Sequence, residues 1–321
     1  MKKAGLRELP FSPEQTEHVC RELRTAGFEP VLLDTDTYYP DDCLSDCEIL
    51  FGYFPKRMLE RARAMKWYQL PCAGADRYVD PGLYPHADFT LTNSSGAFGA
   101  AIAEHLLMGA LMLLRRYPEY GRQQREKVWA RTGNIRLIRD CNVTILGTGN
   151  LGGSFARCVS ALGAQVYGIC RSGKSEESGF DEIAPVDACT DMLSKTDILA
   201  ACLPLTKETE GILNREFFEQ LPHGCIFLNC GRGKTVVQKD LIDALSSGRL
   251  SGALLDVAET EPMPPDCPLW EMENVIITPH VSGSDLDPCN GEIIQKIFLE
   301  NLRLYVSGEK LRNVVDRRAG Y

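Results

Sequence analysis

The first third of the chain alternates short apolar runs with stretches in which apolar residues recur every three or four positions. The apolar runs span residues 28–34, 48–54 and 65–76, and the last of them ends in the glycine-bearing loop CAGAD. Short apolar runs are typical of strands, and the stretches between them are typical of surface helices. This part of the chain therefore predicts an α/β arrangement in which the strands are parallel.

A long, mostly apolar stretch follows at residues 96–116 and predicts a helix. The sequence TNSSG precedes it, and its Asn and Ser suit a helix N-cap. The length of this helix suits a connector between two domains. His105 lies within it and is expected to brace the connector rather than to take part in catalysis.

From Asp140 onwards strand and helix patterns alternate regularly. Strands are expected at 141–147, 164–170, 197–205, 225–230, 251–258 and 274–280, and helices at 150–163, 215–221 and 238–248. Repeated strand-then-helix units of this size predict a doubly wound parallel sheet. A last amphipathic helix at 289–311 is expected to return to the first domain.

These patterns predict two Rossmann-like α/β domains, which a chain of 321 residues can accommodate. The first would be a discontinuous substrate domain made of residues 1–94 plus 286–321. The second would be a dinucleotide-binding domain, residues 95–285, inserted into the first.

Composition narrows the classes of function. The chain is 44% hydrophobic and 25% charged, without an apolar run near 18 residues, so a globular protein that does not span a membrane is expected. The net charge of -9 argues against nucleic acid or an anionic membrane as partner. The 13 cysteines form no C-x-x-C pair, and the first residues do not resemble a secretory signal. Reduced thiols and a cytoplasmic protein are therefore expected.

Gly147, Gly149 and Gly152 form G-x-G-x-x-G between an expected strand and an expected helix. In such a loop the first glycine makes the turn, the second lets the backbone approach a pyrophosphate, and the third lets the helix pack on the strand. Phosphates then lie at the helix N-terminus, where free N–H groups favour anions. A plain strand-to-helix turn is the alternative, but the context favours dinucleotide binding.

The residues after the next strand bear on which dinucleotide binds. An acid there would hydrogen-bond the ribose hydroxyls of NAD, but this chain has Cys170, followed by Arg171, Ser172 and, two residues on, Lys174. A guanidinium can bind the additional phosphate of NADP through two parallel hydrogen bonds. The sequence therefore favours NADP, with NAD as the alternative.

Three polar residues each follow an expected strand: Arg232, Glu261 and His280. The carboxyl ends of parallel strands share one edge of the sheet, so the three side chains are expected to converge there. Arginine can bind a carboxylate or polarise a keto oxygen, histidine can carry a proton near neutral pH, and a glutamate can orient that histidine. These types suit hydride transfer beside a carboxylate, the nicotinamide supplying the hydride.

At these residues the chain resembles the D-isomer-specific 2-hydroxyacid dehydrogenases, which include glyoxylate and hydroxypyruvate reductases. The blocks GTGNLGG, CLPLTKETEGIL, NCGRGKTVVQKDLIDALSSGRLSGALLDVAETEP and VIITPHVSG follow one another as in that family. The resemblance implies that Arg232 binds substrate, Glu261 pairs with the histidine, and His280 donates the proton during reduction. Ala258 departs from the family pattern, because many relatives carry an aromatic residue there.

The resemblance also implies binding residues and partners. The backbone amides of Ala73, Gly74 and Ala75 would hold the carboxylate of a small anionic 2-keto or 2-hydroxy acid. Further cofactor contacts would come from Asn150, Leu151, Leu203, Pro204, Thr209, Cys230, Asp256 and Gly283. No metal is expected, and a homodimer would form through residues 115–131. The alternative function is a non-enzymatic, nucleotide-sensing corepressor-like protein on the same fold.

Overall fold

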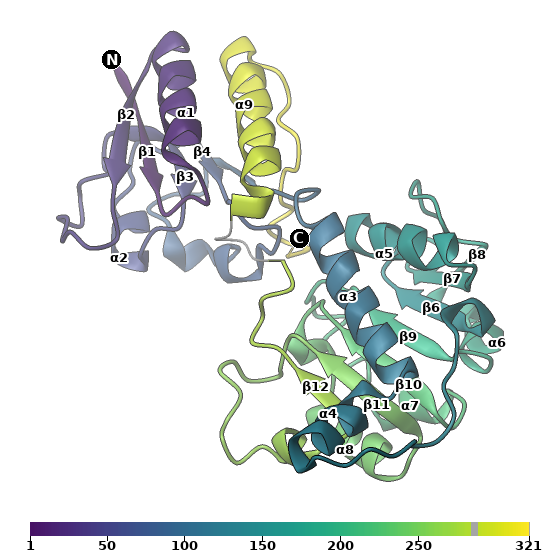
Figure 1. Ribbon diagram of the computed structural model, residues 1–321. Helices are drawn as coiled ribbons and strands as arrows, with labels where there is room; N and C mark the ends of the chain where they lie inside the picture. The colour runs from purple at the N-terminus through teal and green to yellow at the C-terminus, as the bar shows by residue number, and fades with distance from the viewer. Residues whose placement is uncertain (284–287, 321) are drawn as a thin grey trace. The chain divides into compact units, whose positions relative to one another are not determined.

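The computed structural model describes residues 1–283 and 288–320. The chain divides into two compact units, Met1–Phe98 with Ser284–Tyr321, and Gly99–Gly283 (Figure 1). Each unit contains one parallel sheet with helices packed on it. The predicted fold class, two doubly wound α/β domains with one inserted into the other, is confirmed. The expected boundary between residues 285 and 286 lies outside the described residues.

The first unit is built on a five-stranded sheet of order β2-β1-β3-β4-β5, in which every neighbouring pair is parallel. Its strands are β1 Lys2–Arg7, β2 Phe28–Leu33, β3 Cys47–Gly52, β4 Trp67–Gln69 and β5 Thr90–Thr92. The sequence pattern missed β1 and β5. In β1 only the three central residues are buried, and β5 is three residues long, so neither has the apolar run that predicts a strand.

Two long helices accompany this sheet, α1 (Pro13–Thr25) and α9 (Gly291–Ser307), together with the short α2 (Lys56–Leu59). Helix α1 begins at a capping box, in which the Ser12 hydroxyl accepts from the Gln15 amide and the Gln15 side chain accepts from the Ser12 amide. Helix α9 packs on the sheet through Phe298, whose ring stacks on Phe51 at 4.1 Å between centroids. The terminal helix therefore belongs to the first unit, as predicted.

The second unit has a seven-stranded sheet of order β12-β11-β10-β9-β6-β7-β8, also parallel throughout. Its strands are β6 Asn142–Leu146, β7 Gln165–Cys170, β8 Glu182–Pro185, β9 Ile198–Ala201, β10 Cys225–Asn229, β11 Leu250–Leu255 and β12 Val275–Ile277. The chain runs from β6 outward to β8 and then returns to β9 on the other side of β6. In open α/β sheets, ligands bind where the strand order reverses in this way, outside the carboxyl ends.

Six α-helices of this unit are α3 Gly99–Leu114, α4 Tyr117–Glu126, α5 Asn150–Ala161, α6 Thr190–Leu193, α7 Arg215–Glu219 and α8 Gln238–Ser246. Helix α3 is shorter at both ends than the predicted 96–116. Strand β8 was not predicted, because its sequence EIAP is short and partly exposed. Among the described residues, no helix combines the length and the apolar character needed to cross a membrane.

Candidate active site

The glycine loop lies at the carboxyl end of β6, where the strand order reverses. Gly147 has φ +93°, a conformation that other residues rarely adopt. A Cβ at Gly152 would lie 1.9 Å from the Gly147 carbonyl oxygen, so only glycine lets α5 start this close to the turn. At Gly149, the N-cap of α5, nothing lies within 4 Å of where a Cβ would be. The loop therefore leaves open space beside a helix N-terminus, which fits a pyrophosphate.

The loop after β7 is attached to the glycine loop. The Ser175 hydroxyl donates to the Thr148 carbonyl oxygen at 2.6 Å, and it also accepts the Glu177 amide. The Ser172 hydroxyl lies 3.0 Å from the Lys174 carbonyl oxygen, so the turn is also fixed within itself. Arg171 is exposed on this turn. A positive side chain beside the glycine loop can bind a phosphate on the ribose of a nucleotide.

The three polar residues singled out by sequence follow three adjacent strands. Strands β10, β11 and β12 end in register, because Asn229 pairs with Leu255 and Leu255 with Ile277. Arg232 follows β10, Glu261 follows β11 and His280 follows β12. All three thus project from loops at the carboxyl edge of one sheet.

Glu261 and His280 are in direct contact. The His280 Nδ1 atom lies 2.9 Å from Glu261 Oε2, while the other carboxylate oxygen accepts the Ala258 amide at 3.2 Å. The glutamate is therefore oriented by its own loop, and it in turn orients the imidazole. The side chain of His280 is 45% exposed and that of Glu261 is 27% exposed, so the far side of the ring can reach a small molecule.

Arg232 lies on a turn that is held on several sides. Its Nη1 atom donates to the Gly231 carbonyl oxygen at 2.9 Å, and its own carbonyl oxygen accepts the Thr235 hydroxyl at 2.7 Å. A Cβ at Gly233 would lie 1.8 Å from the Ala258 carbonyl oxygen. The turn that carries Arg232 is consequently packed directly against the loop that carries Glu261.

A buried carboxylate organises the loop of His280, and sequence reasoning did not anticipate this contact. Asp256, which follows β11, accepts the Val281 and Ser282 amides, each at 2.9 Å, and the Thr278 hydroxyl at 2.6 Å. Burial alone would raise the pKa of Asp256, but hydrogen bonds from the Ser282 and Thr278 hydroxyls and from these two amides outweigh it and hold the pKa below its usual value. The carboxylate is therefore a charged acceptor at neutral pH.

The remaining residues expected at the cofactor also follow strands of the second unit or begin α5. The Thr209 hydroxyl donates to the Pro204 carbonyl oxygen at 2.6 Å, which fixes the loop after β9. Cys230 is buried directly after β10. The others lie at the start of α5, after β9 and after the loop of His280: Asn150, Leu151, Leu203 and Gly283.

The loop expected to bind a carboxylate lies in the first unit, after β4. The Asn93 side-chain amide donates to the Ala73 carbonyl oxygen at 2.7 Å, and the Ser94 amide donates to the Cys72 carbonyl oxygen at 2.9 Å. Residues after β5 thus fix the backbone at Cys72 and Ala73, where the loop begins. Fixed backbone amides can bind an anion without losing conformational entropy.

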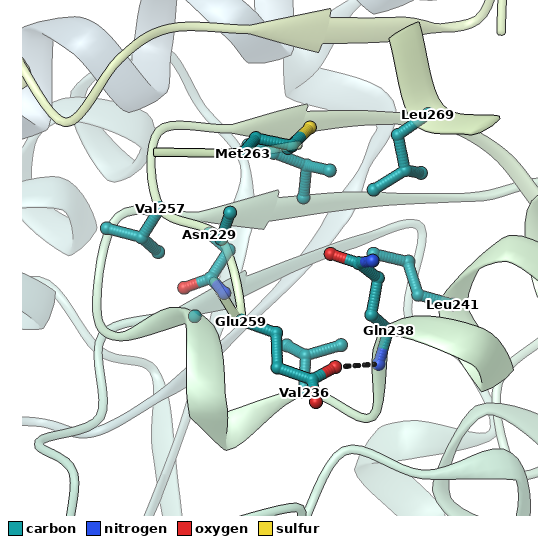
Figure 2. A pocket seen from close by; sticks show the side chains of 11 residues that line it. Asn229, Val236, Gln238, Leu241, Val257, Glu259, Met263 and Leu269 are labelled. Carbon is teal, nitrogen blue, oxygen red and sulfur yellow. Dashed lines mark hydrogen bonds between the residues drawn. The ribbon is translucent and has the colours of Figure 1, made fainter. Parts of the chain in front are cut away.

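The loop of Ala258 and Glu259 forms part of the wall of a small pocket, and Figure 2 shows the side chains that line it. Most of them are apolar, and the Glu259 carboxylate accepts the Gln238 backbone amide at 3.2 Å. Arg232, Glu261 and His280 are not among the described residues that line this pocket. We interpret it as packing that supports the loop of Glu261.

Comparisons with known proteins agree with this fold. Residues 107–282 match the family model described as D-isomer specific 2-hydroxyacid dehydrogenase, NAD binding domain. The fold is similar to that of a D-isomer specific 2-hydroxyacid dehydrogenase family protein from Aeromonas salmonicida, with 31% identity and a TM-score of 0.85 over 99% of this chain and 100% of the other.

Two further solved structures resemble the whole chain and contain a nucleotide. One is an NADPH-dependent glyoxylate/hydroxypyruvate reductase from Sinorhizobium meliloti in complex with NADP and sulfate, with 31% identity, a TM-score of 0.85 and full coverage of both chains. The other is a D-isomer specific 2-hydroxyacid dehydrogenase from Xanthobacter autotrophicus in complex with NADPH, with 28% identity, a TM-score of 0.81 and full coverage of both chains.

Proposed function

The chain belongs to the D-isomer specific 2-hydroxyacid dehydrogenase family, and we propose that it reduces a short 2-keto acid to the D-2-hydroxy acid, with NADPH as the preferred cofactor. The observation that carries this proposal is the 2.9 Å contact between His280 and Glu261, on loops after two adjacent strands of the nucleotide-binding sheet. Glyoxylate and hydroxypyruvate are the proposed substrates, because a structural relative is a reductase of both.

His280 is the proposed proton donor. The Glu261 carboxylate can only accept a hydrogen bond, so Nδ1 of the ring donates to it and Nε2 is left to face the substrate. When bound, the reduced nicotinamide supplies the hydride that adds to the keto carbon. In the protonated ring Nε2 also carries a hydrogen. This proton would pass to the keto oxygen, which becomes the hydroxyl, and the ring, now neutral, would recover a proton from solvent.

Two groups are proposed to hold the substrate. The guanidinium of Arg232 is planar and permanently charged, so it can bind the carboxylate and the keto oxygen at the same time. From the family resemblance, the backbone amides of Ala73, Gly74 and Ala75 are also proposed to bind the substrate carboxylate. The turn of Arg232 and the backbone at Ala73 are held by hydrogen bonds without substrate, which reduces the entropy lost on binding.

The proposed cofactor site combines the glycine loop with the turn after β7. Gly147, Gly149 and Gly152 would bind the pyrophosphate, and Arg171 with Ser172 would bind the additional phosphate of NADP. The position that an acid would occupy in an NAD-specific site is Cys170. The remaining contacts are assigned to Asn150, Leu151, Leu203, Pro204, Thr209, Cys230, Asp256 and Gly283.

Arg171→Ala is expected to raise the Kd of NADPH about tenfold and to change that of NADH less than twofold. Only NADPH carries the phosphate that the guanidinium would bind, and a charge-assisted hydrogen bond contributes roughly 1.5–3 kcal/mol. Titration of the protein fluorescence with each cofactor measures both constants. Arg139→Ala, at an exposed arginine in the short 3-10 helix before β6, is the matched control. An equal loss of affinity for NADPH and NADH would contradict the proposed preference for NADPH.

A substrate panel tests the activity itself. The protein is mixed with NADPH and a series of 2-keto acids, and the absorbance of the reduced nicotinamide is followed over time. Turnover of glyoxylate or hydroxypyruvate is expected. Cofactor binding without turnover of any acid would instead favour a nucleotide-sensing, corepressor-like protein.

We also propose a cytosolic homodimer. The 13 cysteines are all free, which suits a reducing compartment. The segment after α4 carries exposed apolar side chains, among them Val128 at 47% and Trp129 at 103%. Monomeric proteins rarely leave such residues clustered in water, and the segment lies within the residues that the family resemblance assigns to the dimer contact.

Trp129→Glu is expected to convert the dimer into a monomer, because it places a charge where an apolar side chain would be buried. Sedimentation velocity at several protein concentrations measures the mass. Val306→Glu, at an exposed apolar position on α9, should leave the dimer intact. A wild-type protein that sediments as a monomer at every concentration would contradict the proposal.

A further inference from the structure

We propose that His105 is a positioning residue for the reaction: through Thr278 and Asp256 it fixes the backbone that carries His280. The proposal rests on the proposed function, since it concerns how the proton donor of that reaction is held. His105 lies on α3, far in sequence from the other two residues, and its side chain is only 14% exposed.

The contacts form a chain with a defined direction. The His105 Nε2 atom lies 3.0 Å from the Thr278 hydroxyl, which donates its single proton to Asp256 Oδ1 at 2.6 Å. A hydroxyl that donates to a carboxylate can only accept from a third group. The hydrogen on His105 must therefore lie on Nε2, so the imidazole donates to the threonine.

Asp256 connects this chain to the loop of the proton donor. Its carboxylate also accepts the amides of Val281 and Ser282, and its backbone carbonyl oxygen accepts the amide of His280 at 2.8 Å. The carboxylate itself is fully buried. These bonds act on His280 itself and on residues within two positions of it, so Asp256 fixes where the loop lies.

The backbone of His280 requires such support. Its φ is +55°, a left-handed conformation that is unfavourable for a non-glycine residue and persists only where the surroundings impose it. The direction of its side chain, and hence the contact with Glu261, follows from this conformation. Loss of the donor at position 105 would leave the Thr278 hydroxyl without its imidazole partner. The loop that carries His280 would then be less firmly fixed.

The test compares two substitutions at one position. His105→Gln retains a side-chain N–H donor, whereas leucine in His105→Leu has a similar size but no hydrogen-bond donor. His105→Leu is expected to lower kcat about 10- to 100-fold, the usual effect of a misplaced catalytic group, with the KM for NADPH changed less than twofold. His105→Gln should remain within about threefold of the wild type in kcat, because its N–H donor largely keeps His280 in place. Met108→Leu, at an exposed position on the same helix, is the matched control.

A double-mutant cycle separates positioning from general destabilisation. Thr278→Val breaks the same chain, so adding His105→Leu to it should lower kcat no further. Additive losses in kcat, or a His105→Gln variant as impaired as His105→Leu, would overturn the proposal. Thermal unfolding of each variant identifies any that is not folded, and the glutamine variant then decides.

Nitrogen NMR of the imidazoles gives a reading that needs no turnover. We expect His105 to show the tautomer protonated on Nε2, and we expect His105→Leu to shift the His280 nitrogens while His105→Gln leaves them nearly unchanged. His280 signals identical in all three proteins would overturn the positioning role. A wild-type protein that turns over no keto acid would instead contradict the proposed function, and the NMR result would still decide the role of His105.

Discussion

His280→Gln is expected to lower kcat for reduction of the keto acid about 1,000-fold, within the 10²- to 10⁴-fold range of general acid–base catalysis. Glutamine has about the size of histidine and can still donate a hydrogen bond to the keto oxygen, but it cannot release a proton near neutral pH. The Kd of NADPH should change less than twofold, since the substitution retains the volume and the polarity of the side chain. Stopped-flow measurement of a single turnover and a cofactor titration give the two numbers.

The control for this variant is His223→Gln, at an exposed position in the same unit, which should behave as the wild type. Glu261→Gln is informative beside it. An amide can still contact Nδ1 but cannot balance the positive charge of a protonated ring, so a loss smaller than that of His280→Gln is expected. Unchanged turnover in His280→Gln would exclude the ring as the proton donor.

The fold could be predicted from sequence wherever strands are long and apolar. The alternation after Asp140 predicted all but one strand of the second sheet, and the glycine spacing predicted the start of α5. The missed strands β1, β5 and β8 are short or bounded by lysine, threonine and proline, and their pairing depends on neighbours that the local pattern cannot show.

The candidate site was partly predictable for a similar reason. Arg232, Glu261 and His280 could be found because each follows a strand, and parallel strands end at one edge. The bonds from Asp256 to the loop of His280 could not be found in this way. They depend on the register in which β11 and β12 end together and on an αL backbone at position 280, both of which arise only in the assembled sheet.

His105 shows the same limit at longer range. Its place in an apolar helix indicated a bracing role, but its contact with Thr278 spans 173 residues of sequence. Such a contact is set by how α3 packs on the sheet, and no periodicity within the helix contains that information. Positioning residues are therefore harder to recognise from sequence than the groups that they position.

Arg232→Lys is expected to lower kcat/KM for the keto acid about 100-fold, although it keeps the charge. A lysine ammonium binds as a point charge and cannot reproduce the planar fork, so one of the two charge-assisted hydrogen bonds to substrate is lost. Such a bond contributes roughly 1.5–3 kcal/mol, and each 1.4 kcal/mol corresponds to about a tenfold change. Initial rates over a range of keto acid concentrations measure the loss.

Chemical rescue makes this prediction specific to the guanidinium. Arg232→Ala should be about as impaired as the lysine variant or more so, and added guanidinium ion should restore part of its activity by occupying the vacated space. The lysine variant should not respond, because its own side chain fills that space. Arg215→Lys, at an exposed arginine on α7 that pairs with Asp243, is the control and should retain full activity. If lysine served as well as arginine at position 232, the side chain would act through its charge alone, and the two-point binding of substrate would have to be abandoned.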